Sequence, residues 1–508
     1  MKKKYLIIAF ILLLGFYRTS LLCRGAMAFP DESRYGYSIY ALDCLRNQDF
    51  KGFLSNIFIT QARPGDAILH LIPAGVQGIL YQTAGWDPRL PVSLLIPQLL
   101  NLLISLLLPL VFYRLSLILL KGFHPAFSAT VVYSLLANSN IYVRHLLPYD
   151  AALLIFLSAL FYVLKGNRST EVPVKTAGIA GILAALGFLT YPGYYYGPVL
   201  VWGALMIRGG GKRPDKITAK STAVFAASLA LVMLMFEGLA RSGGSSYLNN
   251  AMGLSATITQ GSFEEGFTFG FKYLIQVEGI IGLLLIICFL GYVGLNVREL
   301  TRQGPKKLPK DDVFLLFILS GTGFLIHASL SAIFHKMVFY GRLLHLYLPF
   351  LVWVGFKGLE SLKASGWRKA SYAVMIAGSV ASFSFFAFSY GSLAYPRDVL
   401  YRYRILWPGL DSEKVFFERH PAKRVIAPPS PKIKGIDPAK LDTSLTMVNA
   451  GYFYPVKGPY EPYFPPDHQV KIFTGRHFLT FPAYIFEGYS MAERTIMRKQ
   501  NINISVFK

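Results

Sequence analysis

The sequence has few charged residues and few cysteines, and both shortages exclude classes of protein. Only 15% of its 508 residues are Asp, Glu, Lys or Arg, whereas a soluble globular domain has about 25%. The three cysteines, Cys23, Cys44 and Cys288, form no Cys-x-x-Cys pair and no zinc-binding spacing with histidine. A disulfide-rich scaffold and a zinc domain are therefore excluded. The chain also has no internal repeat and no low-complexity tract.

Long apolar runs are what the sequence has instead. Hydrophobic residues make up 53% of the chain and the mean hydropathy is +0.43. Apolar runs of membrane-spanning length recur from residue 5 to residue 390. We therefore expect an all-α polytopic membrane protein with about eleven spans. The spans fall near residues 5–22, 92–113, 126–143, 150–165, 176–191, 194–208, 221–238, 273–296, 313–334, 343–357 and 370–390.

The net charge of +24 is at first sight typical of a nucleic-acid-binding protein, but the placement of the charges favours a membrane protein. With the N-terminus in the cytoplasm, the cytoplasmic segments hold about 22 Lys and Arg, and the short outer loops hold about five. We therefore expect membrane lipids as partners and no nucleic acid. The orientation places the N-terminus in the cytoplasm and the C-terminus outside a plasma or inner membrane.

The N-terminal stretch resembles a signal peptide, and Ala26-Met27-Ala28 resembles a cleavage site. Its apolar run is a little longer than the apolar region of a typical signal peptide. We interpret it as an uncleaved first span that tethers the following residues at the membrane surface.

Two stretches lie outside the spans. The outer loop 23–91 has apolar residues at helical spacing, which predicts amphipathic helices near 35–50 and 66–82. Residues 393–508 contain clustered prolines and more charge. In that stretch KRVIAP, SLTMVNAGYFYP and INISVFK read as strands, and 482–499 as a helix. We expect residues 1–392 to form the transmembrane domain, and 393–508 a small extracytoplasmic α/β or α+β domain.

Ionisable residues gather at the predicted outer ends of the spans. Asp31 and Glu32 follow the first span, and further candidates come from three other outer segments. Charge beside hydrocarbon is unfavourable, so such residues are functional candidates. The full set of candidates is Asp31, Glu32, Arg63, Arg144, His145, Asp150, Lys336 and Arg342.

Structural roles are the alternative for each candidate. Asp31 and Glu32, or Asp150, could cap the helices that follow them, and Arg144 could pair with Asp150. Lys336 and Arg342 could contact lipid headgroups. The tyrosines of TYPGYYYGP, near residue 191, are typical of interfacial anchors; a stacking platform for sugar is the other interpretation.

Three ordered motifs resemble GT-C fold glycosyltransferases over roughly residues 1–360. They are FPDESRYGYSIYA after the first span, RHLLPYDAALLIFLSALFYVL at the junction of spans three and four, and GRLLHLYLPFLVWVGFKGLE in a late span. The group they resemble most includes the lipid A aminoarabinose transferases and the protein O-mannosyltransferases, which are similar to glycosyltransferase family 39. Residues 393–508 resemble no family member.

The resemblance implies a polyprenyl-phosphate-linked sugar donor, used on the non-cytoplasmic face with inversion at the anomeric carbon. By position, Asp31 would be the catalytic carboxylate and Asp150 a second essential acid. The aminoarabinose transferases carry an acid before Lys-Pro in the first loop, but this chain has Ala62-Arg63-Pro64 followed by Asp66. We therefore assign no metal ligands, although a divalent cation is a possible cofactor. The Asp-x-Asp motif for a nucleotide-sugar metal is also absent.

Physical chemistry supports the same scheme. An acceptor hydroxyl needs a base, and a partly desolvated carboxylate can act as one. The cations Arg342 and Lys336, with Arg63, Arg144 and His145 nearby, could offset the charge that develops on the lipid phosphate. The sequence thus predicts an integral-membrane inverting glycosyltransferase of the cell envelope with a glycan, lipid or protein acceptor. The alternatives are a transporter or flippase of lipid-linked glycan and a silent scaffold for the C-terminal domain.

Overall fold

The computed structural model describes a helical bundle and a separate group of strands. The described helical residues are 2–23, 30–58, 63–85, 92–165, 172–208, 216–259, 267–303, 312–334, 341–362 and 364–391, and the described strands lie between 415 and 507. The chain divides into two compact units, one of Met1–Cys23 with Phe29–Ser384 and one of Arg24–Ala28 with Phe385–Lys508. Each unit is described by itself.

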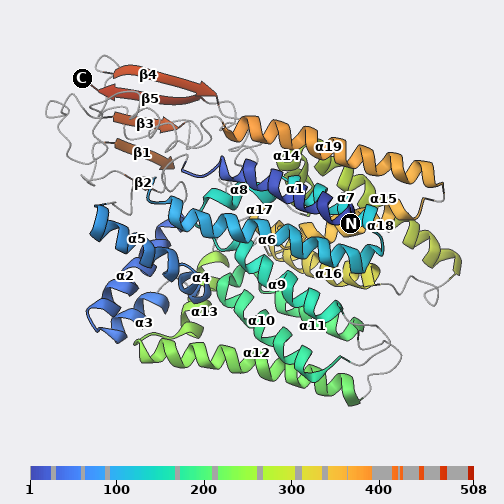
Figure 1. Ribbon diagram of the computed structural model, residues 1–508, viewed down its shortest axis with the longest axis horizontal. Coiled ribbons are helices and arrows are strands. Elements are labelled where there is room, and N and C mark those ends of the chain that lie inside the picture. The colour runs from blue at the N-terminus through green and yellow to red at the C-terminus, as the bar shows by residue number, and fades with distance from the viewer. Residues whose placement is uncertain are drawn as a thin grey trace. The chain divides into compact units, whose positions relative to one another are not determined.

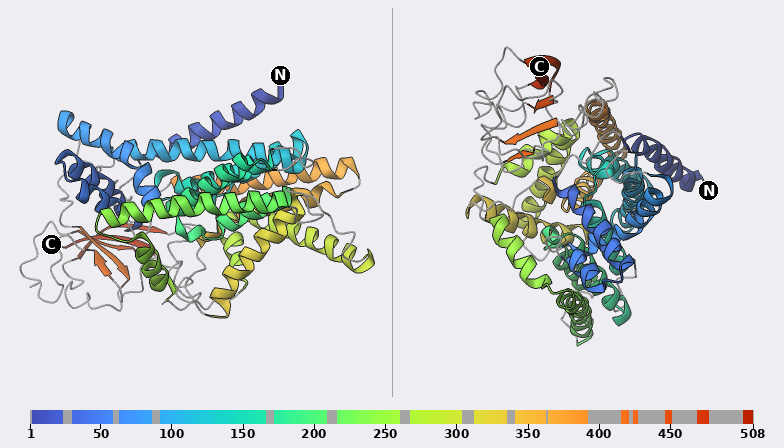
Figure 2. Two further views of the ribbon diagram at one scale, coloured as in Figure 1. Left: turned by 90° about the horizontal axis from the view of Figure 1, so that it is seen from below. Right: turned by 90° about the vertical axis from the view of Figure 1, so that its left-hand side faces the viewer.

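The helices of the first unit follow one another with short connections (Figure 1). In Figure 1 and in the left view of Figure 2 the axes of the long helices α6 and α12 are nearly parallel, and the chain runs along them in opposite directions. In chain order the elements are α1 (Lys2–Thr19), η1 (Pro30–Arg34), α2 (Tyr35–Arg46), α3 (Phe50–Phe58), α4 (Pro64–Leu69), α5 (Leu71–Ala84), α6 (Leu95–Leu120), α7 (Phe123–Leu135), α8 (Asn138–Ile141), η2 (Tyr142–Arg144), α9 (Tyr149–Leu164), α10 (Val174–Thr190), η3 (Pro192–Tyr194), α11 (Gly197–Arg208), α12 (Lys216–Ser242), α13 (Tyr247–Thr259), α14 (Phe269–Glu278), α15 (Ile280–Gln303), α16 (Asp312–Ala332), α17 (Gly341–Leu344), α18 (Leu348–Glu360) and α19 (Ser365–Gly391).

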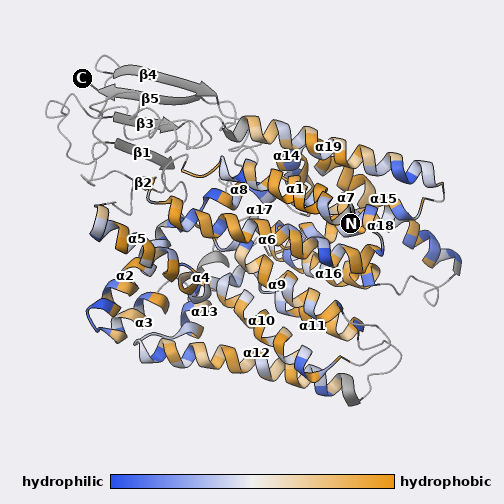
Figure 3. Ribbon diagram, in the orientation of Figure 1, coloured by the Kyte–Doolittle hydropathy of each residue, from blue (hydrophilic) through white to orange (hydrophobic). Residues whose placement is uncertain are grey.

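Five helices in the described part of the chain are long and apolar enough to cross a membrane. They lie in Leu95–Leu120, Ala219–Ser242, Ile280–Arg302, Asp312–Ala332 and Ser365–Phe388. Three shorter apolar helices lie in Tyr5–Thr19, Tyr149–Leu164 and Val174–Thr190. Apolar residues colour most of the length of these helices in Figure 3. The protein is therefore a helical membrane protein, while the count of eleven spans and the orientation of the termini stay predictions.

Two of the expected spans are interrupted. The apolar run 126–143 forms α7, which ends at Leu135, and then the short helices α8 and η2. The run 273–296 is divided at Gly279, whose φ of 61° lies in the left-handed region that glycine adopts without strain. Hydropathy does not detect such breaks, because the residues on either side stay apolar.

The break after α7 is held by the charge of Arg18 from α1. Arg18 is 1% exposed. Its Nε donates to Asn140 Oδ1 at 2.9 Å, and its Nη2 donates to the carbonyls of Ser139 at 3.0 Å and Ser134 at 3.4 Å. Its Nη1 donates to the carbonyl of Ser105. In an apolar environment, carbonyls that a helix end leaves without partners must be satisfied, and the guanidinium does this.

The start of α8 is held by a charge of opposite sign, Glu278 at the end of α14. Its two carboxylate oxygens accept hydrogen bonds from the backbone N–H groups of Ala137 at 2.6 Å and Asn138 at 2.9 Å. A carboxylate suits a helix N-terminus, where N–H groups are exposed and the helix dipole is positive. Arg18 and Glu278 together fix the course of the chain that leads into η2.

A polar stripe along α6 positions the residues that follow η2. The stripe consists of Gln98, Asn101, Ser105 and Ser116, which are buried and lie on one face at helical spacing. Two of its members donate to the segment at η2: Gln98 Nε2 donates to the Arg144 carbonyl at 2.8 Å, and Asn101 Nδ2 donates to the His145 carbonyl. Two accept from other parts of the chain: Gln98 Oε1 accepts from the Cys23 N–H at 2.9 Å, and Ser116 Oγ accepts from Trp353 Nε1 at 2.8 Å. Polar groups thus join helices that apolar contact alone would not orient.

Small residues bring α10 close to α12. A Cβ placed on Gly181 would lie 2.4 Å from the backbone oxygen of Phe225, so only glycine allows this approach. Ala177, Ala180, Ala184 and Ala185 are buried in the same helix. Membrane helices pack in this way when small residues let their backbones meet.

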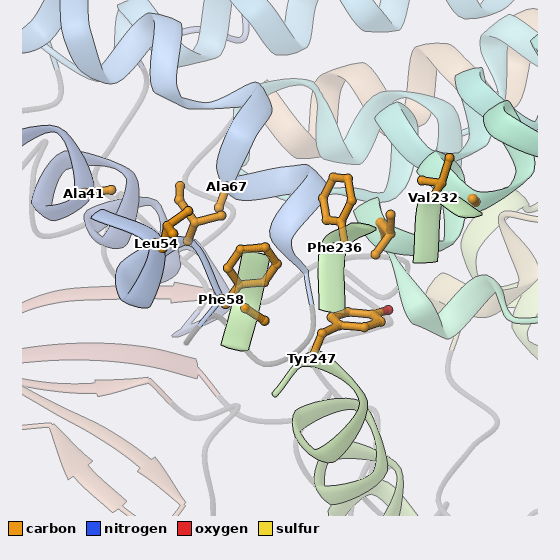
Figure 4. Close-up of a cluster of buried hydrophobic side chains, with 11 residues drawn as sticks. Ala41, Leu54, Phe58, Ala67, Val232, Phe236 and Tyr247 are labelled. Carbon is orange, nitrogen blue, oxygen red and sulfur yellow. The ribbon is translucent and has the colours of Figure 1, made fainter. Parts of the chain in front are cut away.

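An apolar cluster attaches the helices of the first outer loop to the bundle. Its members include Ala41 of α2, Leu54 and Phe58 of α3, Ala67 of α4 and Phe236 of α12. Figure 4 shows these side chains gathered with Tyr247 of α13, and the rings of Phe58 and Phe236 meet edge to face with centroids 6.1 Å apart. The predicted helices of the outer loop are confirmed, although 66–82 is divided between α4 and α5.

The second unit contains a five-stranded sheet in the order β2-β1-β3-β5-β4. Its strands are β1 (Val415–His420), β2 (Arg424–Ile426), β3 (Thr446–Ala450), β4 (Gln469–Arg476) and β5 (Asn501–Phe507). β1 and β3 are parallel, and the other neighbours are antiparallel. The sequence anticipated β2, β3 and β5, but not β1 and β4. The helix expected over 482–499 lies outside the described residues.

Candidate active site

Asp31 lies between two guanidinium groups. It sits on η1, and its Oδ1 is 3.2 Å from Nη2 of Arg34, one turn further along the chain. Its Oδ2 is 3.4 Å and 3.5 Å from the two Nη atoms of Arg63. The Asp31 side chain is 24% exposed, whereas that of Arg63 is 6% exposed. A carboxylate that substrate can reach thus stands beside two cations.

The local sequence Arg63-Pro64-Gly65 places Arg63 against α10. Pro64 starts α4, where its fixed φ suits the first helical turn. Gly65 follows, and a Cβ there would lie 2.8 Å from the backbone nitrogen of Thr190. The absence of a side chain therefore lets α4 press against the last residues of α10, and these two helices contact each other in Figure 1.

Glu32 is turned into the protein, next to Asp31 in sequence. It is 2% exposed, and its Oε1 lies 3.3 Å from Nδ1 of His145 and accepts the backbone N–H of Leu146 at 3.0 Å. The other ring nitrogen of His145, Nε2, accepts a hydrogen bond from Nε of Arg144 at 3.4 Å. This arrangement assigns the proton of neutral His145 to Nδ1. Glu32 therefore connects η1 to the segment that α6 also holds.

Asp150 is paired with His345, a residue that the sequence did not indicate. Oδ1 of Asp150 lies 2.8 Å from Nε2 of His345, which is fully buried. Arg18 also attracts Asp150 electrostatically. Within the described residues, Nδ1 of His345 has no hydrogen-bond partner. Asp150 is therefore a buried carboxylate with a histidine partner, on the first turn of α9.

Among the described interactions, none of the three acids makes a capping hydrogen bond to α2 or α9, although each lies in the first turn of a helix. The residue that caps α2 is Arg34, and no side chain makes a capping hydrogen bond there. The cap of α9 is Pro148, again with no side-chain hydrogen bond, and the ion-pair partner of Asp150 is His345. Glu32 and Asp150 instead contact histidines that are distant in sequence. Asp31 contacts Arg34, three residues away, and the more distant Arg63.

A third pair of an acid and a histidine lies at α4, where Asp66 is in the helix and His70 follows its last residue. Nδ1 of His70 is 3.3 Å from Oδ1 of Asp66 and 3.0 Å from its carbonyl oxygen. Burial by itself lowers the pKa of His70, but the charge and hydrogen bonds of Asp66 outweigh it and raise that pKa above its ordinary value of 6.5.

Replacing His70 with glutamine is expected to lower stability in acid only. Because the folded pKa is raised, the protonated pair stabilises the protein fully below about pH 6.5, and this contribution is lost as pH rises through the folded pKa. The melting temperature of His70→Gln in detergent should therefore fall below that of the original protein at about pH 5.5 and match it near pH 9. A gap that is equal at both pH values would contradict the ionic role.

Two predicted phosphate-binding residues are not placed by side chain. Lys336 lies outside the described residues, and Arg342 lies in α17 with its side chain outside the described part. The structure brings together Asp31 with Arg63, and Glu32 with Arg144 and His145. Sequence reasoning missed Arg34, which its spacing of three residues from Asp31 could have indicated, and His345, which is 195 residues from Asp150. Among the described residues, no three His, Cys, Asp or Glu side chains converge as metal ligands.

Comparisons with known proteins give similarity at low identity. No family model matches the sequence, and no curated protein matches it. Among solved structures, the chain is similar to ArnT from Cupriavidus metallidurans bound to undecaprenyl phosphate, with a TM-score of 0.47 and 13% identity over 79% of this chain and 72% of that one. It is also similar to the oligosaccharyltransferase AglB from Archaeoglobus fulgidus in complex with an inhibitory peptide and a dolichol-phosphate. That TM-score is 0.47 with 12% identity, over 80% of this chain and 59% of that one, less than two thirds of its length. The resemblance drawn from the motifs thus has a counterpart in two solved structures, one bound to undecaprenyl phosphate and one in complex with a dolichol-phosphate.

Proposed function

We propose that this chain is an integral-membrane inverting glycosyltransferase. It moves a sugar from a polyprenyl-phosphate donor to a glycan, lipid or protein acceptor on the non-cytoplasmic face. The observation that carries the proposal is the reachable carboxylate of Asp31 between the guanidinium groups of Arg34 and Arg63. A base and two phosphate-binding cations at one point are what this transfer requires. Residues 393–508 would form a separate extracytoplasmic domain.

The proposed reaction is a single displacement. The acceptor hydroxyl passes its proton to a carboxylate oxygen of Asp31, and its oxygen bonds to the anomeric carbon. The bond from that carbon to the phosphate oxygen breaks on the opposite face of the sugar, and its electron pair stays on the phosphate. The products are an inverted glycoside and a polyprenyl phosphate. Arg34 and Arg63 would balance the negative charge that the phosphate gains.

The ion pairs of Asp31 explain how one carboxylate can serve as a base. Beside two guanidinium groups a carboxylate is a weak base. When the donor phosphate enters, it competes for the same N–H donors, and the Asp31 oxygens lose those partners. The carboxylate then becomes more basic when the donor is in place.

The remaining candidates have supporting roles in this proposal. Glu32 and His145 hold η1 against the residues that follow η2, so they orient Asp31. Arg144 completes that group, and Asp150 with His345 forms a buried second pair. Lys336 and Arg342 stay proposed phosphate ligands. A divalent cation is a possible addition, with no assigned ligands.

The test uses the purified protein in lipid vesicles. Radiolabelled polyprenyl-phosphate sugars are added one at a time with a membrane glycan extract, and label is followed from the carrier to the acceptor. We expect label to leave the carrier only when protein and acceptor are both present. Label that crosses the bilayer while still attached to its carrier would favour a flippase. Vesicles without protein and reactions without acceptor are the controls.

A further inference from the structure

Three of the four tyrosines that follow α10 are buried. Tyr191 is 4% exposed, and Tyr194 and Tyr196 are also buried, while Tyr195 is 37% exposed. An interfacial anchor presents its ring to lipid headgroups, so that interpretation is wrong for the three buried rings. A sugar platform needs an open ring face, and burial closes the faces of Tyr191.

One neighbour of the Tyr191 ring is Arg63. The guanidinium carbon of Arg63 lies 5.0 Å from the ring centroid of Tyr191, which is within the range of a cation–π interaction. The same guanidinium reaches Asp31 with both Nη atoms. Those contacts, at 3.4 Å and 3.5 Å, are long for charge-assisted hydrogen bonds. The ring therefore supplies a second constraint on where the guanidinium lies.

The local sequence Tyr191-Pro192-Gly193 fixes the ring in this place. The residue before a proline is restricted to extended backbone, and Tyr191 has φ −146° and ψ 98°, which ends α10. A Cβ on Gly193 would lie 2.5 Å from the Tyr191 ring, so only glycine leaves room for the ring. The rings of Tyr149 and Tyr194 meet it edge to face, each with centroids 4.8 Å away.

We propose that Tyr191 is a positioning residue that holds the guanidinium of Arg63 against Asp31. The proposal rests on the proposed function, because it concerns the carboxylate that would act as base. The Tyr-Pro-Gly sequence then has a role in the site. It ends α10 at Thr190, so that the next residue, Tyr191, lies beside Arg63. Gly65 of α4 lies against Thr190, the residue before Tyr191. The end of α10 therefore contacts both α4 and Arg63, the residue that precedes α4.

The charged groups around Asp31 define what a titration would report. Arg34 lies on η1, as Asp31 does, and Arg63 is the residue before α4. Glu32, the residue after Asp31, pairs with His145, which also contacts Arg144. Asp66 and His70 form a further pair at α4. Arg63 contacts the Tyr191 ring, with its guanidinium carbon 5.0 Å from the ring centroid. A change at Tyr191 should therefore affect Asp31 through Arg63.

The experiment compares pH profiles of kcat/KM for the donor, which report the enzyme before the donor binds, for Tyr191→Leu, Tyr191→Phe, Arg63→Met and the double variant. Removing a cation beside a carboxylate moves its titration to higher pH. We expect the acid limb to move up by about one unit in Tyr191→Leu and Arg63→Met, and no further in the double variant. Tyr191→Phe keeps the ring face and should behave as the original protein. Tyr162→Leu, which removes a cation–π pair with Lys165 elsewhere on α9, should leave the profile unchanged.

Two outcomes would overturn the proposal: an equal loss of rate at every pH in Tyr191→Leu, or additive shifts in the double variant. Should Tyr191→Leu fail to fold, fluorinated phenylalanine at 191 weakens the cation–π attraction while keeping the ring shape, and it should shift the profile relative to Tyr191→Phe. The infrared carboxyl band that Asp31→Asn removes gives the same titration without turnover. If the original protein transfers no sugar but this band shifts in Tyr191→Leu, the proposed function fails and the positioning role stands.

Discussion

Replacing Asp31 with asparagine is expected to lower the rate of sugar transfer by about a hundred- to ten-thousandfold, the usual contribution of a positioned base. Asparagine has nearly the same shape, but it cannot accept the proton of the acceptor hydroxyl. It also leaves Arg34 and Arg63 without the carboxylate that they face. The donor phosphate would then meet less competition, so donor binding should be retained or strengthened. The measurement is kcat and KM for donor with the labelled transfer assay.

The matched control for this change is Asp43→Asn. Asp43 lies on α2, also pairs with an arginine three residues away, and its side chain is 54% exposed. It should change neither kcat nor KM. If Asp31→Asn transfers sugar at the original rate, Asp31 is not the base, and the buried acids Asp150 and Glu32 would be examined next.

Replacing Arg18 with methionine is expected to destabilise the protein by about 3–5 kcal/mol, the range for removing one partner from a buried charged network. Methionine fills a similar volume, but it removes the guanidinium that donates to the carbonyl of Ser139 and to the side-chain oxygen of Asn140. Asp150 also loses the cation that attracts it. The free energy of unfolding in mixed micelles, from a denaturing-detergent titration, gives the difference.

Arg114→Met is the control for Arg18, since Arg114 is an exposed arginine on a spanning helix, α6. Its loss should lie within about 0.5 kcal/mol of zero, as for other exposed substitutions. Equal destabilisation by both changes would mean that Arg18 acts only as a charge in a membrane helix. In that case the break after α7 would need another explanation.

The helices were predictable from sequence where their apolar residues are continuous, as in α6, α12 and α16. Their interruptions were not. The break between Leu135 and Asn138 depends on Arg18 and Glu278, which come from helices far away in the chain. A hydropathy average over neighbouring residues contains no information about such partners. The break at Gly279 has a local signal in the sequence, because glycine adopts a positive φ without strain.

For the candidate site, too, the sequence indicated the individual residues but not the contacts between them. Asp31, Glu32, Arg63, Arg144, His145 and Asp150 stand out because each is an ionisable residue beside an apolar run. Which of them meet is a tertiary property: Glu32 accepts from Leu146, 114 residues away, and Asp150 meets His345. Tyr191 was visible as part of a tyrosine cluster, but its partner could not be inferred, since Arg63 reaches it only when α4 packs on α10.

Arg18 also bears on how the chain enters the membrane during synthesis. Its partners lie 87 to 122 residues further along, so none exists when α1 leaves the ribosome. At about 5–20 residues per second, the last of them follows after roughly 6–24 seconds. During that interval α1 carries an uncompensated charge beside its apolar residues. The first helix is therefore expected to stay at the insertion machinery, or near the membrane surface, until α6 to α8 arrive.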